Sequence, residues 1–189
     1  MVTIIRRSEW TDTQVRFVSR LKAQGIVIHH SATPNAKVLS GEEERKRVIR
    51  VLRSIFLHHT GSNGWVDIGY HFVIGRGGLI VEARSMSAQT LKDGLMVPGA
   101  HCPTKNTTHI GICLEGNYMS EDVPSNMWES LVKLMAALSL AAGFALNRNT
   151  VLLHREVRQT SCPGDVVAAK IDAILEHANR VRSRHQEVK

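Results

Sequence analysis

The sequence lacks any hydrophobic run long enough to cross a bilayer. Its longest apolar stretch, residues 131–146, is interrupted by Lys133, Ser139 and Gly143, whereas a membrane-spanning helix needs roughly 20 predominantly apolar residues. Residues 1–7 carry charge but have neither the apolar core nor the small-residue cleavage site of a secretory signal. We therefore predict a protein that is synthesised in the cytosol and has no membrane span.

Cysteine and aromatic residues are also scarce. The three cysteines are an odd number with no Cys-x-x-Cys pair, which argues against a disulfide framework and leaves one of them open to a role as metal ligand or nucleophile. Only 5% of the residues are aromatic, and no segment interleaves aromatic with basic residues in the manner of a nucleic-acid-binding module. We expect no nucleic-acid partner.

The net charge of +7 nevertheless favours a polyanionic partner, such as nucleic acid, an anionic membrane surface or an acidic wall polymer. Much of the excess lies in residues 45–53 and 180–189. Each segment is either a binding patch or simply a solvated helix face, and charge alone does not choose between these readings.

Nothing in the sequence divides the chain, which has no internal repeat and no Pro/Gly/Ser-rich linker. We interpret its 189 residues as one domain, with a core from about residue 4 to 180 and a basic C-terminal tail. Apolar periodicity predicts an α/β fold, in which helices flank a mixed central sheet of five or six strands. The predicted strands are residues 25–30, 70–74, 78–82, 109–114 and 150–154, and the predicted helices begin near Ser40, at 127 and at 165.

Two of the ten histidines lie where predicted strands end. His29 closes the first strand and His154 closes the last, and Cys162 follows eight residues after His154. Two imidazoles and one thiolate suit zinc, and three protein ligands leave a fourth position for water, as in catalytic zinc sites. Taken singly, each residue is more often a satisfied polar side chain or a small buried hydrophobe.

Four blocks of sequence, in order along the chain, resemble the type-2 N-acetylmuramoyl-L-alanine amidase family. They are residues 27–33 (VIHHSAT), 64–74 (GWVDIGYHFVI), 99–117 with its GAH and IGICLEGN motifs, and 154–163 (HREV through CP). That family includes phage amidase-type lysozymes and peptidoglycan recognition proteins, and Arg7-Ser8-Glu9-Trp10 is similar to the start of the latter branch. The resemblance implies a fold of the amidase and peptidoglycan recognition protein type.

The resemblance also implies an activity, which is zinc-dependent hydrolysis of the amide bond between N-acetylmuramic acid and L-alanine in peptidoglycan. It places the zinc ligands on His29, His154 and Cys162 and the catalytic tyrosine on Tyr70, whose hydroxyl would donate a hydrogen bond to the oxyanion. Phage members often carry lysine where this chain has Thr160, a departure that removes a fixed positive charge and leaves a neutral donor.

Other residues have weaker assignments. We assign substrate binding to His101 and Asn106 in a loop of the third block. The alternatives are a His101 that is simply exposed to solvent and an Asn106 that hydrogen-bonds its own loop. Cys102 is expected to be an exposed thiol, and Cys113 a buried strand residue. The group that carries the proton is left open among three glutamates, which are Glu82, Glu115 and Glu156.

The absence of a signal peptide favours a phage or prophage endolysin that is released to the cell wall through a holin-type pore. A cytosolic amidase that trims recycled muropeptides is the second reading. A recognition module that binds muropeptide without cutting it is the third, and the complete ligand set counts against it. Whether a regulatory protein partner exists stays open.

Overall fold

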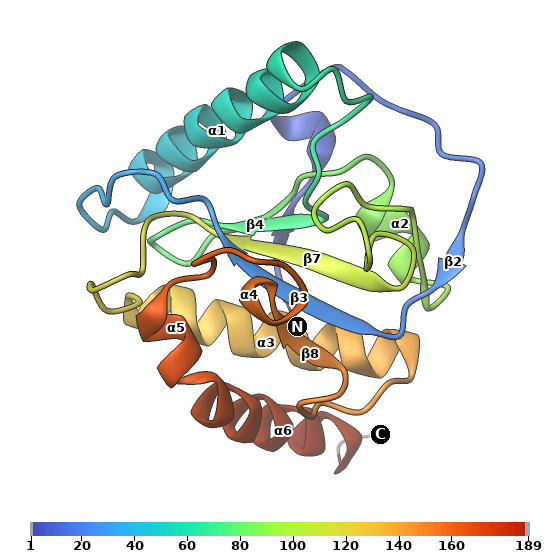
Figure 1. Cartoon of the computed structure of the whole chain (residues 1–189), viewed down its shortest axis with the longest axis vertical. Coiled ribbons are helices and arrows are strands. Elements are labelled where there is room, and N and C mark those ends of the chain that lie inside the picture. The colour runs from blue at the N-terminus through green and yellow to red at the C-terminus, as the bar shows by residue number, and fades with distance from the viewer. Residues whose placement is uncertain (1, 188–189) are drawn as a thin grey trace.

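A mixed sheet of six strands forms the centre of the computed structural model, which describes residues 2–187 (Figure 1). The strand order is β1-β5-β4-β7-β3-β8, and all neighbours are parallel except β4 and β5. The strands are β1 (Ile4–Ile5), β3 (Gly25–His30), β4 (Phe72–Ile74), β5 (Ile80–Glu82), β7 (His109–Leu114) and β8 (Val151–Leu153). A separate antiparallel pair consists of β2 (Leu21–Lys22) and β6 (Leu95–Met96).

Three long helices cover the sheet, with α1 on one face and α3 and α6 on the other (Figure 1). Their bounds are α1 (Gly41–Leu57), α3 (Ser125–Ala142) and α6 (Ile171–Glu187). The short helical segments are η1 (Arg7–Glu9), η2 (His58–Ser62), α2 (Ser87–Leu91), α4 (His154–Val157) and α5 (Asp165–Ala169). Within residues 2–187, none of the helices is both long and apolar enough to span a membrane.

Alternation along the central strands sorts their side chains between the two faces. Ile28 and Ile112 pack in the larger core cluster with α3 and α6, whereas Val73 and Cys113 pack in the smaller cluster with α1. Because His29 follows Ile28, its side chain projects to the α1 face of the sheet. The same alternation along β3 therefore directs Ile28 into the core and His29 to the opposite face of the sheet.

The predicted α/β class and sheet are confirmed. All five predicted strands are present: β3 and β7 have the predicted bounds, and β4, β5 and β8 are slightly shorter than predicted. Two details of the helices are wrong. The predicted helix from residue 165 is interrupted at Lys170 and forms α5 and α6, and the helix predicted from residue 127 begins at Ser125.

The basic residues of α1 are largely engaged within the protein. Arg45 pairs with Glu9, and Arg53 donates to the backbone oxygen of Trp10 at 2.8 Å. Arg47 forms ion pairs with two glutamates. These contacts favour a structural reading of the charge on α1; on the tail, Arg180 pairs with Glu176, and Lys189 lies outside the described residues.

A buried ion pair ties the N-terminal segment to the loop before β4. The guanidinium of Arg7 lies 2.9 Å from the carboxylate of Asp67, and both side chains are at most 2% exposed. Asp67 also accepts hydrogen bonds from the backbone N–H groups of Ile68 and Ser85, at 2.7 and 2.9 Å. Since Tyr70 is three residues beyond Asp67, this pair fixes the backbone that carries Tyr70.

Replacing Arg7 by methionine should destabilise the fold by about 3–5 kcal/mol, because it leaves the carboxylate of Asp67 buried without its counter-charge. Arg6→Met is the matched control, since Arg6 is the exposed neighbour, and it should change the free energy of unfolding little. Urea denaturation measures both. Equal stability of the two variants would contradict the role assigned to Arg7.

Candidate metal centre

The site forms at the carboxyl ends of three adjacent parallel strands, β7, β3 and β8, where α/β sheets commonly place their ligands. His29 occupies the end of β3, between β7 and β8, and its side chain is 1% exposed. The neighbouring His30 points to the opposite face, where its Nδ1 accepts a hydrogen bond from the backbone N–H of Tyr118 at 3.2 Å. Alternation along β3 therefore directs the two histidines to opposite faces of the sheet.

His154 and Cys162 come to His29 from one turn and loop. His154 begins α4 directly after β8, and the loop folds back so that the backbone N–H of Arg155 donates to the oxygen of Cys162 at 2.9 Å. The backbone N–H of His30 points at the sulfur of Cys162, 3.3 Å away. This N–H stabilises a thiolate at that position.

The ligand atoms of these three residues all lie within 4.8 Å of one another. The distance from His29 Nδ1 to Cys162 Sγ is 3.9 Å, whereas ligand atoms of a tetrahedral zinc site lie about 3.3–3.7 Å apart. His154 Nε2 is buried and has no hydrogen-bond partner among the described residues. An orphaned imidazole nitrogen beside a second imidazole and a thiol fits a zinc ion.

The same environment disfavours a cysteine nucleophile. Burial raises the pKa of the Cys162 thiol to about 11, in spite of the His30 N–H and the nearby Arg155 charge, which lower it. Burial also lowers the pKa of His29 well below its usual value. A nucleophilic cysteine needs a lowered thiol pKa, so Cys162 becomes a thiolate here only beside a cation such as a metal ion.

Tyr70 borders the donor set on the α1 side. Its ring centre lies 5.2 Å from that of His29 and 5.5 Å from that of His59. Burial raises the phenol pKa well above its usual value, and the neighbouring Cys113 and Cys162 add to the shift. The hydroxyl is therefore protonated at neutral pH and able to donate a hydrogen bond.

A pocket of about 360 Å³ opens beside Tyr70, between β3 and the end of α1. Of its lining residues only Tyr70 was predicted as a site residue. Sequence analysis missed His59, which lies in the π-helical turn η2. Its ring stacks on Trp65 at 4.6 Å, and its Nδ1 accepts the backbone N–H of Gly69 at 3.1 Å. The sequence feature that could have indicated this pocket is the pair His58-His59, which comes shortly before the block that contains Tyr70. The full lining is Ser31, Thr33, Ser54, Ile55, His58, His59 and Tyr70.

A family profile described as N-acetylmuramoyl-L-alanine amidase matches residues 19–165, which contain the whole donor set and Tyr70. The chain belongs to this family. Peptidoglycan-recognition protein LB of Drosophila melanogaster is 30% identical over 172 residues, which cover 90% of this chain and 68% of that protein. The expected family is thus confirmed, and its relatives include peptidoglycan recognition proteins.

Solved structures of the family share the fold. Wild-type Drosophila PGRP-LB is 28% identical with a TM-score of 0.75, and the match covers 92% of this amidase-family chain and 94% of that one. The N-acetylmuramoyl-L-alanine amidase LysC from Clostridium intestinale URNW is 25% identical with a TM-score of 0.67, covering 93% and 99%. The similarity therefore extends to both recognition proteins and an amidase.

His101 and Asn106, both assigned to substrate binding, make contacts within the protein. The alternative of a solvent-exposed His101 is wrong, and the alternative of an Asn106 that hydrogen-bonds its own loop is confirmed. The His101 side chain is 8% exposed, and its ring nitrogens face His29 and the backbone oxygen of His109, at 3.0 Å each. Asn106 turns its side-chain oxygen to the backbone N–H groups of His101 and Cys102, at 2.8 and 2.9 Å. Neither residue lines the pocket beside Tyr70.

Thr160 lies in the loop that carries Cys162, and its hydroxyl oxygen accepts the backbone N–H of Cys162 at 3.2 Å. The hydroxyl proton stays available to donate. Among the other cysteines, the expectation for Cys102 is wrong, because it is 1% exposed, whereas Cys113 is buried in β7 as expected.

The three glutamates considered as proton carriers all accept hydrogen bonds from backbone N–H groups or pair with arginine side chains. Glu82 accepts the backbone N–H of Arg7 and Ala88 at 3.2 and 2.8 Å. Glu115 pairs with Arg47, and Glu156 pairs with Arg148 and accepts the N–H of Leu153. These contacts stabilise the fold.

Proposed function

We propose that this protein is a zinc-dependent amidase that hydrolyses the bond between N-acetylmuramic acid and L-alanine in peptidoglycan. The observation that carries the proposal is the convergence of His29, His154 and Cys162 on one point beside the pocket of Tyr70. Three protein ligands with an open fourth position are typical of catalytic zinc sites.

Each side chain has a definite task in this reaction. A zinc ion held by the three ligands would lower the pKa of coordinated water to about 7 and polarise the scissile carbonyl. The protonated hydroxyl of Tyr70 donates a hydrogen bond to the carbonyl oxygen as negative charge develops there. Thr160 offers a second, neutral donor from the loop of Cys162.

A recognition module that binds muropeptide without cleavage is the alternative in a different class. Relatives support binding, since a variant of Drosophila PGRP-LB has been solved in complex with tracheal cytotoxin. The complete donor set of this chain favours catalysis in addition, because binding alone gives no reason for a buried thiol and two imidazoles to converge.

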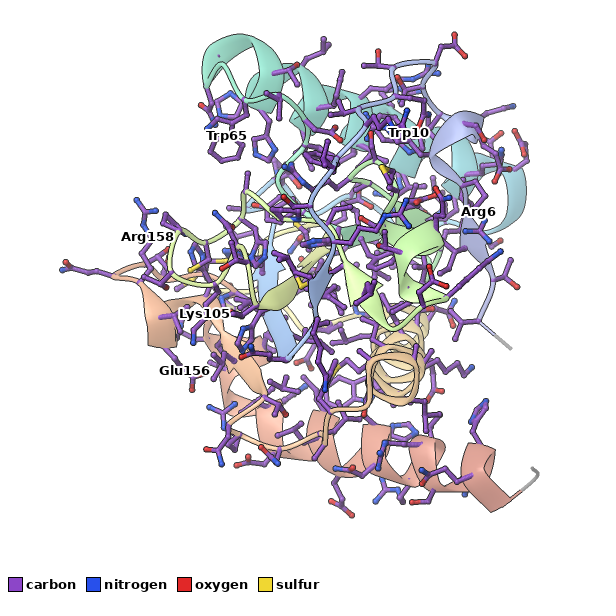
Figure 2. The ribbon with its side chains drawn as sticks, turned by 90° about the vertical axis from the view of Figure 1, so that its right-hand side faces the viewer. Arg6, Trp10, Trp65, Lys105, Glu156 and Arg158 are labelled. Atoms are coloured by element: carbon purple, nitrogen blue, oxygen red, sulfur yellow. The ribbon has the colours of Figure 1, made fainter. Side chains whose placement is uncertain are left out.

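We also propose that the substrate is intact cell wall reached after release through a pore, as for an endolysin, rather than soluble recycled fragments. The net charge of +7 supports attraction to an anionic wall. Trp65, Lys105 and Arg158 lie along one side of the molecule, together with the acidic Glu156 (Figure 2).

The reaction predicts a specific product. Purified sacculi incubated with the protein should release peptides with free L-alanine amino termini, which mass spectrometry identifies. Removal of zinc by a chelator should abolish release, and added zinc should restore it. Cleavage of a glycosidic bond, or full activity after exhaustive metal removal, would contradict the proposal.

Two cysteine-to-serine variants test whether zinc binding and cleavage depend on Cys162. Cys162→Ser should bind zinc far more weakly and release no peptide while still sedimenting with sacculi, because a hydroxyl is a poor ligand near neutral pH. Cys102→Ser changes a buried cysteine outside the donor set and should leave zinc content unchanged. A soluble muropeptide cleaved faster than sacculi would favour a recycling enzyme.

Removal of the Tyr70 hydroxyl should slow turnover without loss of the metal. Tyr70→Phe is expected to lower kcat on the order of 10²-fold, because one oxyanion donor is lost. Tyr118→Phe removes the only other tyrosine hydroxyl, which donates to the backbone oxygen of Glu115 at 2.6 Å, and should affect stability rather than kcat. Wild-type turnover in folded, zinc-loaded Tyr70→Phe would remove Tyr70 from the mechanism.

A further inference from the structure

A short chain of hydrogen bonds runs from the backbone of β7 to the expected metal ligand His29. His101 Nε2 lies 3.0 Å from the backbone oxygen of His109, and His101 Nδ1 lies 3.0 Å from His29 Nε2. Both rings are buried, at 8% and 1% exposed. Within the described residues, the other nitrogen of His29 faces Cys162 Sγ at 3.9 Å.

This chain of bonds allows only one placement of protons for neutral rings. A carbonyl oxygen only accepts, so the proton of His101 must be on Nε2, where it is donated to His109. His101 Nδ1 then carries a lone pair, and His29 Nε2–H donates to it. His29 Nδ1 is left unprotonated and directed at Cys162, which is the state that a metal ion requires.

The position of the His101 ring is built into the surrounding backbone. A side-chain carbon added at Gly99 or Gly111 would lie 2.6 Å from atoms of this ring, so both positions accommodate it only as glycine. The ring of His71 packs edge-on at 5.6 Å, and Asn106 fixes the backbone N–H of His101 at 2.8 Å. Such packing holds one ring orientation.

We propose that His101 is a positioning residue for the metal centre, which sets the tautomer and the ring orientation of His29 through its Nδ1 and does not contact the substrate. The inference rests on the proposed zinc site. It predicts that loss of the acceptor on His101 weakens metal binding, although His101 is not itself a ligand.

Two substitutions at the same position separate the acceptor from the packing. His101→Phe keeps a planar ring but has no acceptor for His29 Nε2–H. His101→Asn is smaller but carries an oxygen near the place of Nδ1. Zinc affinity, measured by competition with a chromophoric chelator, should fall about 10- to 100-fold in the Phe variant and recover substantially in the Asn variant.

Gly111→Ala provides an independent test that leaves His101 in the sequence. The added methyl group would displace the ring that lies 2.6 Å away, so zinc affinity should fall as in His101→Phe. Thermal unfolding of the metal-free proteins shows whether each variant is folded, and this second variant keeps the inference testable if His101→Phe does not fold.

A separate readout distinguishes positioning from substrate contact. Sedimentation of each metal-free variant with purified sacculi should equal that of the wild-type protein. Wild-type zinc affinity in folded His101→Phe, or weakened sedimentation with unchanged zinc affinity, would overturn the inference. The proposed amidase activity fails by a different observation, the absence of L-alanine termini among the products of the zinc-loaded wild-type protein.

Discussion

The His29 imidazole is almost fully buried, and a buried imidazole is costly unless both of its ring nitrogens have partners. His101 Nδ1 lies 3.0 Å from His29 Nε2. The other ring nitrogen of His29 faces the position where His154 and Cys162 converge. The need for a partner at His29 Nε2 explains why Gly99 and Gly111, which border the His101 ring, have no side chains. The need for a partner at His29 Nδ1 explains why a buried thiol with a raised pKa is kept next to neutral histidines.

Sheet topology places the His29 imidazole at the edge of the sheet where the other site residues converge. β3 lies between β7 and β8 and is parallel to both, so the carboxyl ends of all three strands meet at one edge. The tight turn of α4 after β8 directs His154 to the same edge, and the Arg7–Asp67 ion pair fixes the approach of the chain to Tyr70. A rigid core thus supports a site whose ligands come from distant parts of the sequence.

Sequence reasoning succeeded where local chemistry determines the outcome. The β-branched runs predicted five of the six strands of the sheet, all except β1. The resemblance to the amidase family placed the metal ligands on the three side chains that converge. Sequence reasoning did not place the His101 ring, because nothing local in residues 99–106 indicates that this ring fits against Gly111. Contacts of this kind depend on the register of β7 against the loop. The same reason applies to His59, whose place beside Tyr70 depends on the π-helical turn after α1.

The central claim, that two imidazoles and one thiolate hold one zinc ion, is tested most directly by X-ray absorption spectroscopy of the zinc-loaded protein. The account predicts one sulfur at about 2.3 Å and two nitrogens at about 2.0–2.1 Å, with a light atom in the fourth position. In Cys162→Ser the sulfur contribution should disappear. A wild-type spectrum with nitrogen and oxygen ligands alone, or with more than one sulfur, would contradict the account.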